Sequence, residues 1–242
     1  MNSARTYRRS ARKGKTYIIA TVGAVVMFLL LGGWGALKGY EEELVIEEEE
    51  AAELQHQLLI QEEEDHIPYA AYFKEYAPLV GWEWEMLAAV GFAESRFKPT
   101  ALSPFGASGI MQLMPRTAAK YGLNDSTVFE PRDNIEAGAK SLATLKHQFR
   151  FVPDSVERVK FVLAAYNAGT AHILDARALA RKYEANPNRW EEVEPFLALL
   201  SDSVYYTDSV VRWGAFQGGE TMRYVGKVHG VYARIKQGKL KL

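Results

Sequence analysis

The segment 94–115 contains the residues of this chain that are best suited to acid–base chemistry. It reads ESRFKPTALSPFGASGIMQLMP, and residues 95–124 contain no further acid. Glu94 lies near the end of an apolar pattern with helical spacing. Burial and the partial negative charge of a helix end both raise the pKa of a carboxyl group, which suits a general acid near neutral pH. We therefore predict a site built around one acid, against the alternative of a surface glutamate paired with Arg96 or Lys98.

The loop after Glu94 combines flexibility with polar and apolar side chains. Gly106 and Gly109 let a bound chain approach the backbone closely. Ser103 offers a hydroxyl, Gln112 offers an amide donor and acceptor suited to an acetamido group, and Met114 offers an adaptable apolar wall. The loop alone is equally consistent with a corner between two helices.

The elements that position this loop are predicted to be helices. Period-2 alternation is scarce, so we expect a mostly α domain over 67–237, built of many short helices and followed by a short tail at 238–242. Apolar spacing and proline or glycine breaks predict helices at 68–81, 84–94, from Pro115, at 134–149 and 155–168, and near 170–183, 190–213 and 221–237.

Composition excludes several kinds of chemistry. The 242 residues have a net charge of −1 and include no cysteine, so thiolate nucleophiles, disulfides and cysteine-based zinc sites are ruled out. The five histidines show no HExxH spacing, and no P-loop or GxGxxG sequence is present. We expect no metal or other cofactor, and the charge gives no drive toward nucleic acid.

The N-terminal region has the pattern of a membrane anchor. Residues 1–16 are a basic tail, and 17–37 contain no charge, enough for a helix of roughly 31 Å, the thickness of a bilayer core. The positive-inside rule places the N-terminus in the cytoplasm and the rest of the chain in the periplasm or outside the cell. The alternative is a cleaved signal peptide, whose apolar region is normally about 7–15 residues long.

An acidic segment at 38–66 separates this span from the globular part. Leu44, Ala51 and Leu58 recur at intervals of seven, which is consistent with a helical stalk or a short coiled coil. A solvated spacer extended by its own charge explains the same composition equally well.

Three further motifs follow the Glu94 segment in a fixed order. They are PRDNIEAGAKSL at 131–142, AYNAG at 165–169, and ET at 220–221 with Tyr224 and Val225. Together with the Glu-Ser pair, a serine nine residues after the Glu, and GASGIMQLMP, they resemble the SLT-type lytic murein transglycosylases, which are relatives of goose-type lysozyme. The resemblance covers roughly 70–235, with Ile110 in place of the commoner Leu and no Pro before Glu220. The segment 170–219 contains no motif of the family that we can place.

The resemblance implies a goose-type lysozyme-like fold and the cleavage of peptidoglycan glycan strands. The MurNAc–GlcNAc β-1,4 bond would be broken with formation of a 1,6-anhydro end. The implied catalytic acid and base is Glu94 alone, and the implied substrate-binding residues are Ser103, Gln112, Met114, Tyr166, Asn167 and Tyr224.

Two other functions remain open on the sequence. A hydrolytic muramidase on the same fold needs a second carboxylate, for which Asp125, Glu130 and Asp133 are near in sequence. A catalytically inactive glycan-binding scaffold needs none of this chemistry. No protein partner is indicated by the sequence.

Overall fold

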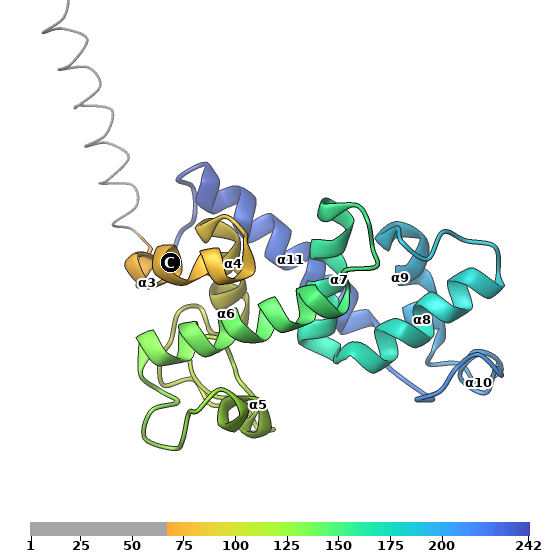
Figure 1. The fold of residues 1–242 in the computed structure, drawn as a ribbon, viewed down its shortest axis with the longest axis horizontal. Helices are drawn as coiled ribbons and strands as arrows, with labels where there is room; N and C mark the ends of the chain where they lie inside the picture. Colours follow the sequence, from red (N-terminus) through yellow and green to blue (C-terminus); the bar gives the residue numbers. More distant parts are fainter. Residues whose placement is uncertain (1–66) are drawn as a thin grey trace, which may run out of the picture. The chain divides into compact units, whose positions relative to one another are not determined.

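The computed structural model describes residues 67–242, and its regular structure is helical (Figure 1). The helices are α3 (Ala70–Val80), α4 (Trp84–Ser95), α5 (Pro115–Lys120), α6 (Pro131–Gln148), α7 (Ser155–Ala168), α8 (Thr170–Lys182), α9 (Trp190–Leu199), α10 (Ser203–Tyr206) and α11 (Gly219–Lys236). In this part of the chain β-structure is limited to isolated bridges that Ser108 makes with Leu102 and Leu113. The predicted mostly α fold is therefore confirmed.

The three N-terminal predictions lie outside the described residues. They are the basic tail at 1–16, the membrane anchor at 17–37 and the acidic spacer at 38–66. Within 67–242, no helix combines the length and the apolar character that crossing a membrane needs.

Helix α4 is the central element of the domain. It is buried along almost its whole length, from Met86 to Ala93, and packs against α3 and α11. A helix that is apolar on all sides is stable only in a core, which explains why other helices enclose this one. The helix ends at Ser95 because Arg96 and Phe97 adopt positive φ angles of 54° and 61°. Glu94 therefore lies in the last turn of a buried helix.

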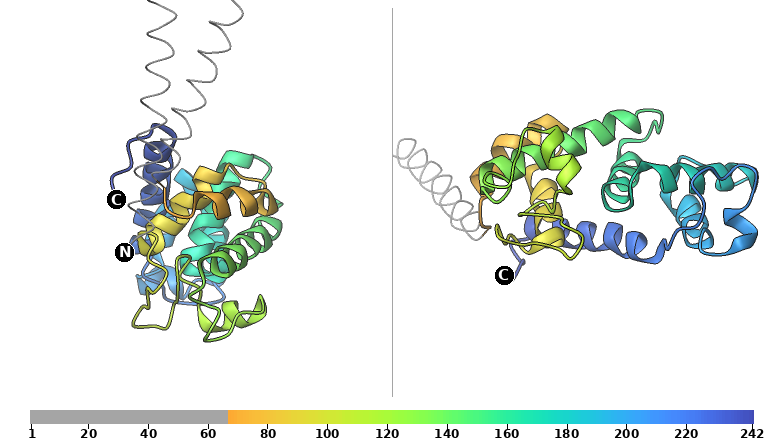
Figure 2. Two further views of the ribbon diagram at one scale, coloured as in Figure 1. Left: turned by 90° about the vertical axis from the view of Figure 1, so that its left-hand side faces the viewer. Right: turned by 90° about the horizontal axis from the view of Figure 1, so that it is seen from below.

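Helix α11 joins the two ends of the described domain. It packs against α4, α7 and α9, while α6 packs against α3 and α7. Figure 1 shows α3, α4 and α6 at one end and α8, α9 and α10 at the other. The two views of Figure 2 show α11 extending alongside both groups. One face of α11 is thus able to contact site residues that come from separate helices.

Asn134 explains the motif at 131–142 in structural terms. It is fully buried, its Oδ1 accepts the backbone N–H of Met111 at 2.7 Å, and its Nδ2 donates to the carbonyl oxygens of Val128 at 2.8 Å and Ser108 at 3.2 Å. Gly109 has φ 78°, and a Cβ there would lie 2.3 Å from the Asn134 amide nitrogen. The asparagine and the glycine together hold the loop that follows α4.

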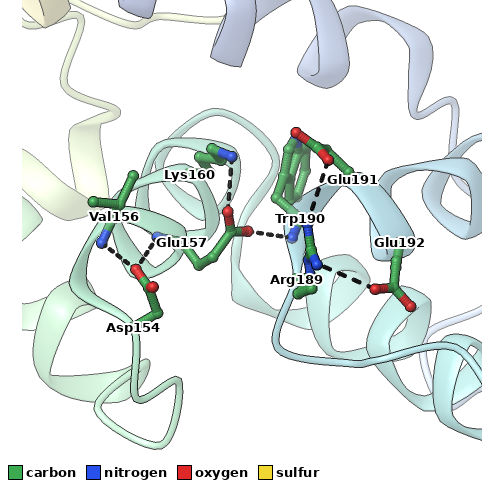
Figure 3. A network of polar contacts seen from close by, with 8 residues as sticks. All are labelled: Asp154, Val156, Glu157, Lys160, Arg189, Trp190, Glu191 and Glu192. Carbon is green, nitrogen blue, oxygen red and sulfur yellow. Dashed lines mark hydrogen bonds and ion pairs between the residues drawn. The ribbon is translucent and has the colours of Figure 1, made fainter.

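The packing of α7 against α9 depends on a polar network (Figure 3). Glu157 accepts hydrogen bonds from Lys160 at 2.8 Å and from the backbone N–H of Trp190 at 2.6 Å. Asp154 caps α7 by accepting from the backbone N–H groups of Val156 and Glu157. These contacts satisfy the exposed N–H groups at the N-termini of both helices.

Three predicted boundaries are wrong. Helix α6 begins at Pro131 rather than at Asn134, because a proline suits the first position of a helix. Helix α3 begins at Ala70 rather than at Pro68, because Tyr69 has a φ of 64°. The helical pattern predicted near 190–213 is divided into α9 and the short α10. After α10, the buried carboxylate of Asp175 accepts the backbone N–H groups of Arg212 and Trp213, so these groups are not used in a helix.

Candidate active site

Glu94 lies at the position where α4, α7 and α11 meet around a carboxyl group. The hydroxyl of Tyr224, on α11, donates to Glu94 Oε1 at 2.6 Å. Glu94 remains partly exposed, but burial of its carboxyl group raises its pKa to about 7, against the opposing effects of Tyr224 and of the Lys227 charge. Arg96 instead lies over the ring of Phe92, 5.8 Å from its centroid. The carboxyl group therefore has the properties of an acid near neutrality rather than those of a surface ion pair.

Tyr166 approaches Glu94 from α7. Its hydroxyl donates to the carbonyl oxygen of Met111 at 2.8 Å, which ties α7 to the loop after α4. Burial and the negative charge of Glu94 raise the pKa of both Tyr166 and Tyr224 well above the ordinary value. Both phenols therefore stay protonated across the physiological pH range and act as hydrogen-bond donors.

A cavity of about 370 Å³ adjoins Tyr166. It is lined by Gln112, Leu113, Met114, Thr117, Ser141, Leu145 and residues 165–170. The structure thus brings four of the predicted substrate-binding residues to one cavity, namely Gln112, Met114, Tyr166 and Asn167. Tyr166 belongs both to the cavity and to the surroundings of the acid. Glu94 and Tyr224 do not line this cavity, so Tyr166 is the residue that connects the cavity to the acid.

Gln112 and Ser103 have structural contacts that the sequence did not predict. Gln112 has φ 47°, and its Nε2 donates to the carbonyl oxygens of Gly109 at 2.9 Å and Ala101 at 3.2 Å. Its side-chain oxygen is left as the acceptor for a ligand. The hydroxyl of Ser103 accepts the backbone N–H of Ala107 at 2.9 Å, and Ser103 does not line the cavity.

One face of α11 contributes three residues at intervals of three, and sequence reasoning gave a site role only to Tyr224. The hydroxyl of Thr221, which is 1% exposed, donates to Asn167 Oδ1 at 2.8 Å. The ammonium group of Lys227 donates to the carbonyl oxygen of Ala93, next to Glu94. The sequence signal that could have identified Thr221 and Lys227 is their spacing of three residues from Tyr224, because residues at this spacing share one helix face.

The second carboxylate that a hydrolase requires does not appear among the groups that affect Glu94. In the described part of the chain, the groups that shift the pKa of Glu94 are Tyr224 and Lys227. Asp125 lines a different cavity, of about 540 Å³, on the other side of α5. Glu130 precedes α6 and Asp133 lies in its first turn.

Comparison with known proteins gives the family context of this geometry. Residues 71–188 match the family described as "Transglycosylase SLT domain". The chain is 40% identical over 159 residues to membrane-bound lytic murein transglycosylase F of Desulfosudis oleivorans, with 66% of this chain and 34% of that protein covered. It is 37% identical over 164 residues to the Pseudomonas putida protein of the same name, with 68% and 33% covered. The chain thus spans about a third of the length of these relatives.

Among solved structures, the chain is similar to the 70 kDa soluble lytic transglycosylase of Escherichia coli. It is 24% identical to this chain, with a TM-score of 0.49, and the match covers 74% of this chain and 26% of the other. Taken together, the sequence matches support the SLT-type family for the described domain, in agreement with the resemblance seen in the motifs.

Proposed function

We propose that this SLT-type domain, at 67–237, is a peptidoglycan lytic transglycosylase that cleaves the MurNAc–GlcNAc β-1,4 bond and leaves a 1,6-anhydro end. The observation that supports this most strongly is the state of Glu94. Its pKa is about 7, no second carboxyl group of the described residues shifts that pKa, and it is close to two protonated tyrosines, of which Tyr166 lines a cavity with amide side chains. The SLT-type family supports the same activity and substrate.

A single carboxyl group is sufficient when the substrate supplies the nucleophile. Protonated Glu94 donates its proton to the oxygen that leaves C1 of MurNAc, and the C1–O bond breaks. The Glu94 carboxylate then accepts the proton of the C6 hydroxyl of the same sugar, whose oxygen bonds to C1. The proton returns to Glu94 and no water is consumed. An internal nucleophile held close to C1 gains much of the advantage of proximity. Ordinary glycosidases instead use two carboxyl groups.

The pKa of about 7 suits both halves of this cycle. A group that first donates and then accepts a proton works best when its two forms are similar in free energy. Burial favours the acid form, while Tyr224 and Lys227 favour the carboxylate. We assign to Gln112 and Asn167 the orientation of the acetamido groups, since both present amides to the cavity.

The proposed location is the outer side of the cytoplasmic membrane. Residues 17–37 would be retained as an anchor and 38–66 would serve as a spacer, so that the domain reaches the glycan strands in the periplasm. The relatives named above are described as membrane-bound, which supports this arrangement.

The decisive experiment is a digest of purified peptidoglycan by the wild-type chain and by Glu94→Gln. Mass spectrometry of the wild-type digest is expected to show anhydro-muropeptides, and the variant is expected to release none while it still binds the glycan. Undiminished release by Glu94→Gln would disprove the role of this residue. Products that carry an added water and a reducible sugar end would instead identify a hydrolase.

A further inference from the structure

The loop after α4 exposes apolar side chains beside the cavity. Leu102 is 66% exposed, Phe105 is 84% exposed and Met114 is 46% exposed. We call these three residues the apolar lip. Large apolar side chains exposed along one loop favour a contact site, because each loses contact with water when a ligand covers it.

The lip is held by a turn whose polar groups are satisfied within the turn itself. The N–H of Ser103 donates to the carbonyl of Ala107 at 2.8 Å, and the N–H of Gly106 donates to the carbonyl of Ser103 at 3.0 Å. The N–H of Ala107 donates to the Ser103 hydroxyl at 2.9 Å. Pro104 precedes Phe105 in this turn, and the proline ring fixes the φ angle of Pro104 itself. Phe105 is therefore presented by a well-defined turn.

The turn is attached to residues that line the cavity. A Cβ on Gly106 would lie 3.6 Å from Pro115 Cγ, so the turn packs against the residue that follows Met114. On its other side, the Gln112 amide donates to the carbonyl of Ala101, the neighbour of Leu102. Met114 belongs both to the lip and to the wall of the cavity. The lip is thus a continuation of the cavity wall.

The charge of the surrounding segment indicates what kind of ligand covers the lip. Residues 95–124 contain no acid, and their four basic residues, Arg96, Lys98, Arg116 and Lys120, are all exposed. An anionic polymer with apolar faces is complementary to such a surface. A peptidoglycan strand has both properties, because its sugar rings present C–H faces and its peptide substituents carry carboxylates.

We propose that the apolar lip is a glycan subsite, in which Phe105 packs against the C–H face of a sugar ring of the strand that enters the cavity. This inference rests on the proposed function and goes further by naming a residue that extends the site beyond the cavity. Ser103, which the motifs placed in the groove, then acts by shaping the turn that presents Phe105.

The test measures binding to insoluble peptidoglycan in the inactive Glu94→Gln background. Adding Phe105→Ala is expected to weaken binding about tenfold, as the loss of one exposed aromatic contact implies, whereas Phe105→Trp retains binding. Val204→Ala is the matched control, because Val204 is a 68% exposed apolar residue on α10. Thermal unfolding of each variant is expected to be unchanged.

A kinetic measurement separates the lip from the chemistry. With Glu94 intact, Phe105→Ala is expected to raise KM for glycan strands and to leave kcat unchanged. Equal glycan binding by Phe105→Ala and its parent would overturn the proposed subsite. Loss of binding seen only with phosphatidylglycerol vesicles would also overturn it, since the lip would then be a membrane contact. Persistent cleavage by Glu94→Gln alone would overturn the proposed function instead, so the two failures are distinguishable.

Discussion

The regions around Glu94 and Glu157 each contain a partly buried glutamate, yet their pKa values shift in opposite directions. Burial alone would raise the pKa of Glu157, but Lys160 and the backbone N–H of Trp190 outweigh it and lower the pKa below the ordinary value. At Glu94, burial outweighs Tyr224 and Lys227, and the pKa rises to about 7. Burial acts in the same direction at both residues but is much deeper at Glu94, so the net shift depends on burial and on the partners together.

The second part of the difference lies in the partners that contact each carboxyl group. Glu157 accepts hydrogen bonds from the Lys160 ammonium group and from the first backbone N–H of α9, so these direct contacts neutralise its charge (Figure 3). Glu94 accepts from a neutral phenol, while the ammonium of Lys227 is bonded to the carbonyl of Ala93. A carboxylate with charged donors becomes a structural link, and one with a neutral donor keeps a proton that it can transfer.

The sharpest test of this comparison exchanges each glutamate for glutamine. Glu94→Gln is expected to lower the rate of glycan cleavage by at least about 10³-fold, since it removes the proposed general acid, and to leave the fold intact. Glu157→Gln is expected to retain the rate and to lower the free energy of unfolding by roughly 1–3 kcal/mol, since it weakens a link between α7 and α9. Digests and denaturant unfolding measure the two effects. Equal loss of activity in both variants would contradict the comparison.

The pH dependence of stability gives a second contrast. Because the pKa of Glu94 is higher in the folded state, its protonated form favours folding at acid pH, and this contribution is lost as the pH rises through about 7. Glu94→Gln is therefore expected to be more stable than the wild type at pH 8, by at most about 3 kcal/mol, and to differ little at pH 4. For Glu157 the sign is reversed. Because its pKa is lower in the folded state, its carboxylate stabilises the fold at pH values above the pKa of the unfolded state, and this contribution is lost on acidification. Urea unfolding at the two pH values measures both.

The order of helices could be predicted from the sequence because apolar spacing and prolines act locally. Pro115 begins a helix in the structure, as predicted, whereas the start of the helix at Pro131 was predicted too late, at Asn134. The end of the segment 190–213 could not be predicted, because the backbone N–H groups of Arg212 and Trp213 donate to Asp175, a buried acid about 37 residues earlier in the chain. Such long-range contacts leave no periodic signal.

The candidate site shows the same limit. The predicted place of Glu94 at the end of an apolar helix is confirmed, and motif matching named four of the residues that line the cavity, Gln112, Met114, Tyr166 and Asn167. The contact of Lys227 with Ala93 and the internal turn of Ser103 required the fold, since each depends on how a side chain meets another element. The opposite pKa shifts of Glu94 and Glu157 likewise follow from partners that are distant in sequence.

Tyr224→Phe tests whether the neutral donor tunes the acid. The phenol hydroxyl lowers the pKa of Glu94, so its removal is expected to raise that pKa and to move the alkaline limit of activity to higher pH. We expect the maximal rate to fall about tenfold, because the carboxylate formed during the reaction loses its hydrogen bond. The pH profile of kcat/KM measures both changes. Tyr232→Phe is the control, since its hydroxyl contacts Glu83 on the outside of the same helix pair.

Lys227→Met is expected to produce the smallest effect of the series. Its positive charge lowers the pKa of Glu94 from a distance, so its loss raises that pKa and increases the rate at pH 8 relative to the rate at pH 6 by a few-fold. Lys236→Met is the matched control, because Lys236 lies on the same helix as Lys227 and its ammonium group instead contacts Glu83, 2.8 Å away. Lys227→Arg retains the charge and is expected to keep the wild-type ratio. A ratio that changes equally in the Lys227→Met and Lys236→Met variants would show that the overall charge of α11, and not the position of Lys227 beside the acid, sets the pKa of Glu94.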